Sequence, residues 1–154
     1  MKVGILSSGG DAPGINATIR GVGKTAINHY NMNIIGIQNG FSGLLHKDIV
    51  ELNDASLSGI LNLGGTILGT AREKVFRKMI NSPDEKDREE IKKAYHELDL
   101  DCLVCIGGNG TQRTTSMLSK LGLNVIGIPK TIDNDVYGTD VTFGFNTAVD
   151  IATD

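Results

Sequence analysis

The sequence has no apolar run long enough to span a membrane, and its first residues are interrupted too soon for a secretory signal. It also lacks an excess of positive charge: the formal net charge is −3, which excludes a broad basic face for nucleic acid. No internal repeat or low-complexity linker divides the 154 residues, about the length of one ordinary domain. We therefore expect a cytoplasmic globular protein without nucleic-acid or membrane partners, in which any anion site is local.

The few cysteines and histidines do not form a metal or redox pattern. Cys102 and Cys105 have the C-x-x-C spacing of such motifs, but they lie in the apolar stretch 100–106, which predicts a buried strand. Residues three apart on a strand point to opposite faces of the sheet. We therefore expect two separate buried thiols, and the three histidines lack the spacing of metal ligands.

Strand-like and helix-like stretches alternate along a chain that is rich in glycine, with 20 residues. The ranges expected as strands are 2–8, 33–38, 100–106 and 124–128, and those expected as helices are 13–30, 111–121 and a last one from 146. This alternation predicts a three-layer, doubly wound α/β fold with a mostly parallel sheet and helices on both faces. Ligands in such sheets bind at the carboxyl ends of the strands.

The clearest helix signal follows Ser82. This residue is predicted to cap the helix, with Pro83 at the first helical position and Glu85 three residues after the cap. Apolar residues then recur at helical spacing from Ile91 to Leu98, and the charges around them are expected to form a solvated face.

Two glycine-rich loops each join a predicted strand to a predicted helix. In the loop 7–16, Gly9 and Gly10 would let backbone N–H groups approach an anion. The loop 106–111 has three glycines in four positions, more than a turn needs, which favours a phosphate at the helix N-terminus. A plain strand-to-helix turn remains the alternative for each loop.

A third loop, 129–135, carries two carboxylates after a strand. Of Asp133 and Asp135, one could accept a proton from an attacking hydroxyl while the other helps to hold a divalent cation. The same pattern is compatible with an Asx-type turn. In the basic segment that follows 64–71, Arg72 could neutralise phosphate charge during phosphoryl transfer, or could simply begin a surface helix.

Taken together and in order, these motifs resemble the phosphofructokinase family. The resemblance rests on 8–14, 69–72, 107–111, 129–135, 138–140 and 143–148, and its most specific part is the Thr-Ile-Asp-Asn-Asp sequence at the end of the fourth motif. It covers the whole chain. It implies phosphoryl transfer from ATP, with Mg²⁺, to the 1-hydroxyl of fructose 6-phosphate, the glycolytic step that gives fructose 1,6-bisphosphate.

The resemblance also implies roles for individual residues. Asp133 would be the base that takes the proton from the 1-hydroxyl, with Thr131 and Arg72 as further catalytic residues. Thr131, Ile132 and Asp133 would contact the substrate, and Asn109 and Asp135 would help to hold the metal. The residues that would bind the nucleotide are Gly10, Arg72, Glu73, Gly108, Asn109, Gly110 and Thr111.

Three positions bear on the metal and the donor. Asn109 replaces the family's usual metal-binding Asp, and its neutral oxygen should weaken direct binding of Mg²⁺ or leave it to water. Gly110 resembles the ATP-using enzymes, whereas Lys130 resembles the pyrophosphate users. We expect ATP, because Gly110 leaves space for the rest of the nucleotide. A pyrophosphate-dependent phosphofructokinase and a non-catalytic nucleotide-binding or regulatory domain are the alternatives.

The family resemblance further implies a longer, oligomeric protein. The sugar-phosphate site of the family draws on Arg and His residues of a second half and of a neighbouring subunit, in a homodimer or homotetramer. Residues 148–154 read as a helix without a glycine cap, so we expect a fragment that continues. Arg20 and Lys24 resemble positions that bind an allosteric effector. A lipid or NAD kinase would share a glycine loop but not the Thr-Ile-Asp-Asn-Asp sequence.

Overall fold

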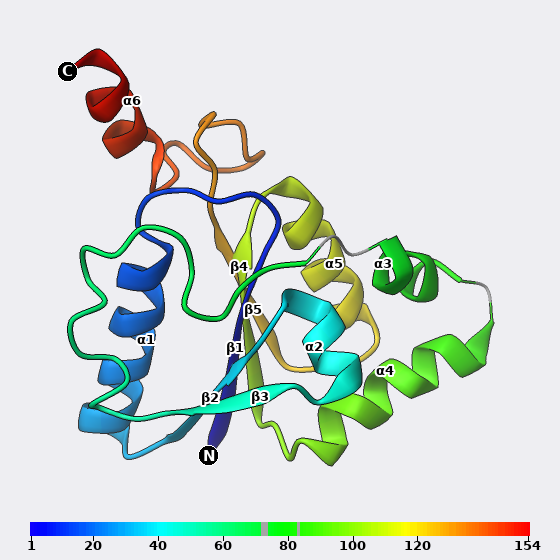
Figure 1. Ribbon diagram of the computed structural model, residues 1–154. Helices are drawn as coiled ribbons and strands as arrows, with labels where there is room; N and C mark the ends of the chain where they lie inside the picture. The colour runs from blue at the N-terminus through cyan, green and yellow to red at the C-terminus, as the bar shows by residue number, and fades with distance from the viewer. Residues whose placement is uncertain (72–73, 83) are drawn as a thin grey trace.

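The computed structural model describes residues 1–71, 74–82 and 84–154, and within them five strands form one sheet (Figure 1). These strands are β1 (Lys2–Ser8), β2 (Asn33–Ile37), β3 (Ile49–Leu52), β4 (Cys102–Gly107) and β5 (Val125–Pro129), in the order β3-β2-β1-β4-β5. Only β3 runs antiparallel to its neighbour. The predicted mostly parallel sheet is confirmed, and the four predicted strands lie within two residues of their expected bounds.

Helices cover both faces of the sheet (Figure 1). One face carries α1 (Ile15–Tyr30) and the irregular segment 53–68, and the other carries α2 (Gly40–His46), α3 (Lys74–Ile80), α4 (Glu85–Glu97) and α5 (Asn109–Lys120). The sequence patterns do not predict α2, α3 or β3, because a seven-residue helix spans only about two turns and the four residues of β3 are too few to show an alternation. Among the described residues, no helix combines the length and the apolar character that a membrane span requires.

The side chains of β4 alternate between the two layers of the core. Cys102, Val104 and Ile106 pack under α1, whereas Leu103 and Cys105 pack under the opposite helices. The expectation that the two buried thiols lie on opposite faces is therefore confirmed, and the sheet itself stands between them.

The start of α4 differs from its prediction. The N-cap is Asp84, whose carboxylate accepts a hydrogen bond from the Lys86 N–H at 3.0 Å, and α4 begins at Glu85. The hydroxyl of Ser82 instead accepts a hydrogen bond from the Asp84 N–H, so the assignment of Ser82 as cap is wrong. Pro83 lies outside the described residues. An acidic cap is favoured here because it also faces the positive end of the helix dipole.

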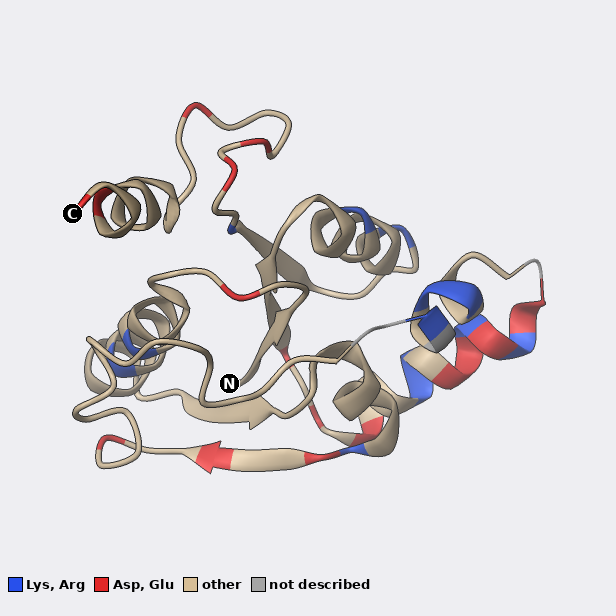
Figure 2. Cartoon of the chain, turned by 45° about the horizontal axis from the view of Figure 1, so that its top comes forward, with Lys and Arg blue, Asp and Glu red and all other residues tan. Residues whose placement is uncertain are grey.

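The exposed side of α4 mixes charges of both signs (Figure 2), as expected for a solvated face. Its opposite side buries Ile91, Ala94 and Tyr95 in the core, which confirms the predicted apolar stripe. At the other end of the chain, α6 (Phe145–Thr153) has no buried residue and projects beyond the carboxyl edge of the sheet (Figure 1).

Candidate active site

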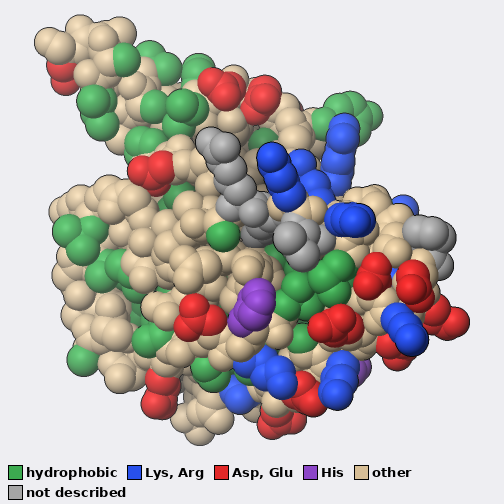
Figure 3. Space-filling view, turned by 45° about the vertical axis from the view of Figure 1, so that its right-hand side comes forward, with side chains coloured by type: hydrophobic (Ala, Val, Ile, Leu, Met, Phe, Trp, Pro, Cys, Tyr) green, Lys and Arg blue, Asp and Glu red, His purple; other side chains and the backbone are tan. Residues whose placement is uncertain are grey.

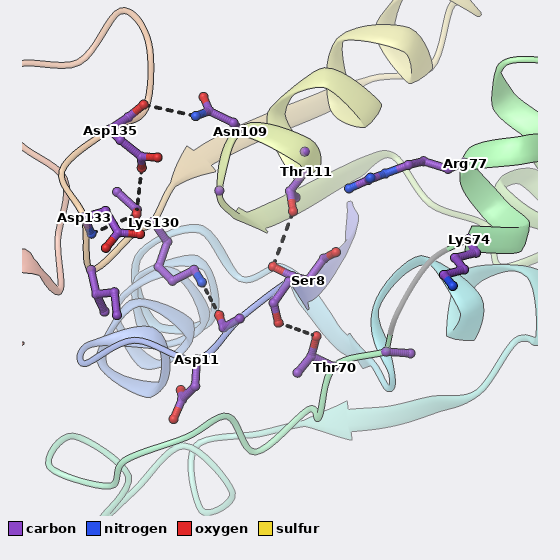
Figure 4. A pocket seen from close by; sticks show the side chains of 17 residues that line it. Ser8, Asp11, Thr70, Lys74, Arg77, Asn109, Thr111, Lys130, Asp133 and Asp135 are labelled. Atoms are coloured by element: carbon purple, nitrogen blue, oxygen red, sulfur yellow. Dashed lines mark hydrogen bonds between the residues drawn. The ribbon is translucent and has the colours of Figure 1, made fainter.

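A cavity of about 890 Å³ lies where β1, β4 and β5 end (Figure 4). It is lined by 8–11 at the end of β1, 108–111 after β4, residues 130–133 and 135 after β5, 70 and 71 before α3, and 74 and 77 of α3. Every predicted catalytic, substrate, nucleotide or metal residue that the structure describes is in this lining. Arg72 and Glu73 lie outside the described residues.

The loop after β1 depends on two glycines with left-handed backbone. Gly9 has a φ of 90° and Gly14 a φ of 92°, a region that other residues rarely adopt. Gly14 is the N-cap of α1, so this helix begins at Ile15 rather than at the predicted residue 13. A side chain on Gly10 would meet nothing within 4 Å, because this residue faces the open cavity.

A second segment is fastened to this loop by hydroxyl groups. The Thr70 hydroxyl donates to the Gly9 carbonyl at 2.9 Å, and the Ser7 hydroxyl donates to the Gly69 carbonyl at 3.1 Å. Sequence reasoning missed Ser7 and Thr70, since these contacts join residues about sixty positions apart. They place residues 69–71 along the wall of the cavity.

Asn16 fixes the residues that come just before this segment in the chain. It is only 1% exposed; its side-chain amide donates to the Leu63 carbonyl at 3.0 Å and accepts from the Ile67 N–H at 2.8 Å. A buried amide has to find such partners. Its sequence signal is a polar residue on the apolar face of the predicted first helix, next to Ile15 and Ile19.

The loop after β4 packs closely against the end of β1. A side-chain carbon on Gly107 would lie 2.6 Å from the Ser8 carbonyl oxygen, so only glycine fits. The buried Thr111 hydroxyl donates to that same carbonyl at 3.3 Å. Gly108 is the N-cap of α5, and the first turn of this helix faces the cavity. The N–H groups of a first turn have no partner within their helix and can bind an anion.

Two cations of α3, Lys74 and Arg77, complete this side of the cavity. Figure 3 shows one group of Lys and Arg side chains on the upper part of the face that it draws, and others, mixed with acidic side chains, lower down. The Arg77 guanidinium lies where a side chain on Gly110 would begin, so the absence of that side chain lets Arg77 cover the start of α5. The space that we expected Gly110 to leave for a nucleotide thus borders directly on Arg77.

The loop after β5 is organised around the Thr131 hydroxyl. It accepts a hydrogen bond from the Asp133 N–H at 3.1 Å and donates one to the Asp135 carboxylate at 2.9 Å. Between the two acids, Asn134 is left-handed with a φ of 52°, and its side-chain oxygen accepts from the Thr142 N–H at 3.0 Å. The local turn contact is thus made by the Thr131 hydroxyl and not by an Asp or Asn side chain as in an Asx-type turn, and the carboxylates of Asp133 and Asp135 stay exposed in the cavity lining.

Asn109 connects α5 to this acidic loop. Its side-chain N–H donates to the backbone carbonyl of Asp135 at 3.0 Å, and its oxygen accepts from the Tyr137 N–H at 3.4 Å. Both ends of the amide are thus directed to backbone groups. Within the ranges described, no three His, Cys, Asp or Glu side chains cluster closely enough to hold a metal by themselves.

Lys130 is the buried cation of the cavity, at 4% exposure. Its ammonium donates to the Gly10 carbonyl, and its backbone N–H donates to the Gly107 carbonyl at 3.0 Å. Burial lowers the pKa of the Lys130 ammonium, and the nearby Asp11 carboxylate opposes this effect.

The two residues that resemble an effector site lie on α1, and neither lines the cavity. Lys24 forms an ion pair with Asp54 at 3.0 Å, and this hydrogen-bonded ammonium lowers the pKa of the Asp54 carboxyl. Arg20 lowers the pKa of the Asp54 carboxyl further, by a smaller amount. The effector role stays a prediction.

The fold and this cavity define an α/β protein whose sheet edge combines glycine-rich, helix-capped loops with an acidic loop. The chain belongs to the phosphofructokinase family, since the family model described as Phosphofructokinase matches residues 2–154.

Individual proteins of this family resemble the chain over nearly all or all of its length. It is 60% identical to ATP-dependent 6-phosphofructokinase 3 of Bacteroides thetaiotaomicron, with 100% of this chain and 46% of the relative covered. It is 43% identical to the pyrophosphate–fructose 6-phosphate 1-phosphotransferase of Dictyoglomus thermophilum, with 100% and 42% covered. The crystal structure of Pichia pastoris phosphofructokinase in the T-state superposes with a TM-score of 0.79 at 31% identity, over 93% of this chain and 16% of that one. The chain thus spans less than half the length of these curated relatives.

Proposed function

We propose that the protein containing this chain transfers the terminal phosphoryl group of ATP to the 1-hydroxyl of fructose 6-phosphate. The observation that carries this proposal is the meeting of two glycine-rich loops and the Asp133 loop around one cavity. Exposed amides at a helix N-terminus suit a phosphate chain, and a carboxylate beside them suits proton removal from an alcohol. The name of the Bacteroides thetaiotaomicron relative supports the same reaction.

Asp133 is the base in this mechanism. Its carboxylate takes the proton of the 1-hydroxyl as the sugar oxygen bonds to the terminal phosphorus, and the bond from that phosphorus to the bridging oxygen breaks. ADP leaves with the electron pair. Thr131 and Ile132 contact the sugar phosphate, and the Thr131 hydroxyl keeps the Asp133 backbone and the Asp135 carboxylate in a fixed arrangement. Arg72 neutralises the charge that develops on the phosphoryl oxygens.

The cavity residues fit a divalent cation such as Mg²⁺. In phosphoryl-transfer sites this ion keeps several waters and uses one or two carboxylates together with the phosphates of the donor. Asp135 would hold it here, whereas the Asn109 amide is engaged with backbone groups on both sides. When bound, the ion would neutralise charge on the transferring phosphate.

For the nucleotide, we assign the phosphates to the first turn of α5 and to Gly10. Gly108, Gly110 and Thr111 bring backbone N–H groups to the cavity, and Arg72 and Glu73 would lie along the nucleotide. The positions of Lys74 and Arg77 in the lining add positive charge on that side. ATP is the favoured donor because Gly110 carries no side chain that would exclude the part of the nucleotide beyond its phosphates, and the space at Gly110 borders on Arg77.

Pyrophosphate is the second candidate donor, and a specific observation favours it. Lys130 places a buried cation in the cavity, and the Dictyoglomus thermophilum relative is named for pyrophosphate. Steady-state assays of the full-length protein with each donor decide between them. A kcat/KM at least about tenfold higher with ATP is the expected result, and the reverse preference would overturn our choice.

We also propose that the chain is the nucleotide-binding domain of a longer, homo-oligomeric protein. It spans 46% of the Bacteroides thetaiotaomicron relative, and α6 leaves Val149 and Ile151 exposed at 43% and 70%. The 154 residues alone should bind nucleotide weakly and turn over poorly. Near-normal turnover by this chain in isolation would refute the domain assignment.

Replacement of Asp133 by Asn tests the reaction itself. The substitution keeps the size of the side chain but removes the base, so kcat of the full-length protein should fall by about a hundredfold or more. Affinity for ATP, measured by calorimetry, should stay within about threefold of the wild type because the glycine-rich loops are unchanged. Asp140→Asn serves as the matched control, because Asp140 does not line the cavity. A non-catalytic binding domain would show no turnover in any variant.

A further inference from the structure

We propose that Lys130 is a positioning residue that holds the three loops of the cavity in one relative arrangement. It begins the acidic loop, its backbone N–H bonds to Gly107 at the end of β4, and its ammonium bonds to Gly10 after β1. One residue thus contacts each of the three strand ends that meet here. The catalytic consequence rests on the proposed function, but the tie between the loops does not.

The contact to Gly10 reaches across 120 positions of the sequence. Gly10 has no side chain to restrain it, and its surroundings on the cavity side are open. Because a peptide bond is planar and trans, the Gly10 carbonyl and the Asp11 N–H point in opposite directions. Fixing the carbonyl with Lys130 therefore also fixes the direction of the Asp11 N–H.

The energetics argue against a simple stabilising role for Lys130. A buried ammonium loses its hydration, and burial lowers the pKa of this group. Among the described residues, this ammonium donates to one neutral carbonyl, that of Gly10, and the Asp11 carboxylate acts on it at longer range. Replacing a buried charge by an apolar side chain of similar volume is often neutral or stabilising. The contribution of Lys130 is thus better sought in the geometry of the loops.

The test compares Lys130→Met with Lys130→Arg in the full-length protein. Methionine has a similar length but no donor, so amide exchange in peptides that cover 9–14 should accelerate by about tenfold or more. With ATP and fructose 6-phosphate, kcat should fall by roughly tenfold to a hundredfold, while KM for ATP stays within about threefold and the melting temperature does not fall. Lys130→Arg keeps a donor, so its kcat and its amide exchange in 9–14 should lie between those of Lys130→Met and the wild type. Lys120→Met, at an exposed lysine of α5, is the matched control.

Each other outcome would overturn the proposal in a recognisable way. A raised KM for ATP with unchanged kcat would show that the ammonium binds the donor directly. A lower melting temperature together with a lower kcat would show that Lys130 stabilises the whole fold and does not act on the loop geometry alone. Unchanged amide exchange in 9–14 of Lys130→Met would show that Lys130 does not restrain the loop after β1, whatever the activity. If the wild type turned over neither donor but Lys130→Met still loosened 9–14, the proposed function would fall and the tie would stand.

Discussion

The side-chain N–H of Asn109 donates a hydrogen bond to the backbone carbonyl of Asp135 at 3.0 Å, which fastens the first turn of α5 to the acidic loop. Its oxygen accepts from the Tyr137 N–H, so Asn109, which was predicted as a metal-binding residue, joins two backbone groups and has a mechanical use here.

Asn109→Asp exchanges this donor for a second acceptor that faces the Asp135 carbonyl. The loss of about one hydrogen bond, ~1 kcal/mol, should loosen the acidic loop, while the added carboxylate should strengthen cation binding. We expect faster amide exchange in 133–137 and tighter binding of Mn²⁺. Electron paramagnetic resonance, recorded with a non-hydrolysable ATP analogue present, measures the Mn²⁺ affinity. Asn109→Ala should loosen the loop without strengthening cation binding. Equal Mn²⁺ affinity in all three proteins would refute this expectation.

Thr131→Val removes a hydroxyl that bonds to both acids while keeping the shape of the side chain. The Asp133 N–H and the Asp135 carboxylate would each lose a partner. We expect kcat to fall by roughly tenfold to a hundredfold, because misplaced catalytic groups lower the rate steeply. Nucleotide affinity, measured by calorimetry, should change little. Thr131→Ser keeps the hydroxyl and should stay close to the wild type; an equal loss in both variants would contradict the assignment.

Gly110→Ala tests the contact between the start of α5 and Arg77. The added methyl would collide with the guanidinium, so Arg77 would have to move away from the helix start. We expect KM for ATP to rise by several-fold, about 1 kcal/mol. In the Arg77→Ala background the same change should have a clearly smaller effect, because contacting residues couple in a double-mutant cycle. Additive effects would mean that Arg77 is not the group displaced.

Tyr95 gives a prediction for alkaline pH. Its hydroxyl donates to the Asn124 carbonyl, and burial raises its pKa from 10.0 to about 12. The folded protein therefore holds this proton more tightly than the unfolded chain. The resulting stability is fully present below pH 10 and is lost as the pH rises toward 12. In urea unfolding, the advantage of the wild type over Tyr95→Phe should shrink across this window. Tyr30 is exposed, so Tyr30→Phe should show no such trend. A difference in unfolding free energy between the wild type and Tyr95→Phe that stays constant with pH would contradict the prediction.

Much of the site could be predicted because its chemistry is local in sequence. Glycines between a strand and a helix, and Asp133 and Asp135 after another strand, sit at positions that a parallel sheet brings to one edge. The contacts that hold these loops together could not be predicted in the same way. Thr70 reaches Gly9 and Lys130 reaches Gly10 only once the strand order is known.

The errors in the fold prediction also have physical causes. Ser82 and Asp84 are both good capping residues, and the sequence pattern does not decide between them. The short α2 and the antiparallel β3 leave no period to detect, so their place between β2 and the segment 53–68 had to come from the structure.

The placement of Cys102 and Cys105 on opposite sides of the sheet provides two natural reporter groups. Each thiol is shielded by a different layer of helices, and burial raises the pKa of the Cys102 thiol, which keeps it in its unreactive protonated form. A thiol reagent can modify either cysteine only when the elements that cover that face of the sheet open locally. The rates of modification at the two sites, read by mass spectrometry, would therefore report separately how often each side of the molecule opens.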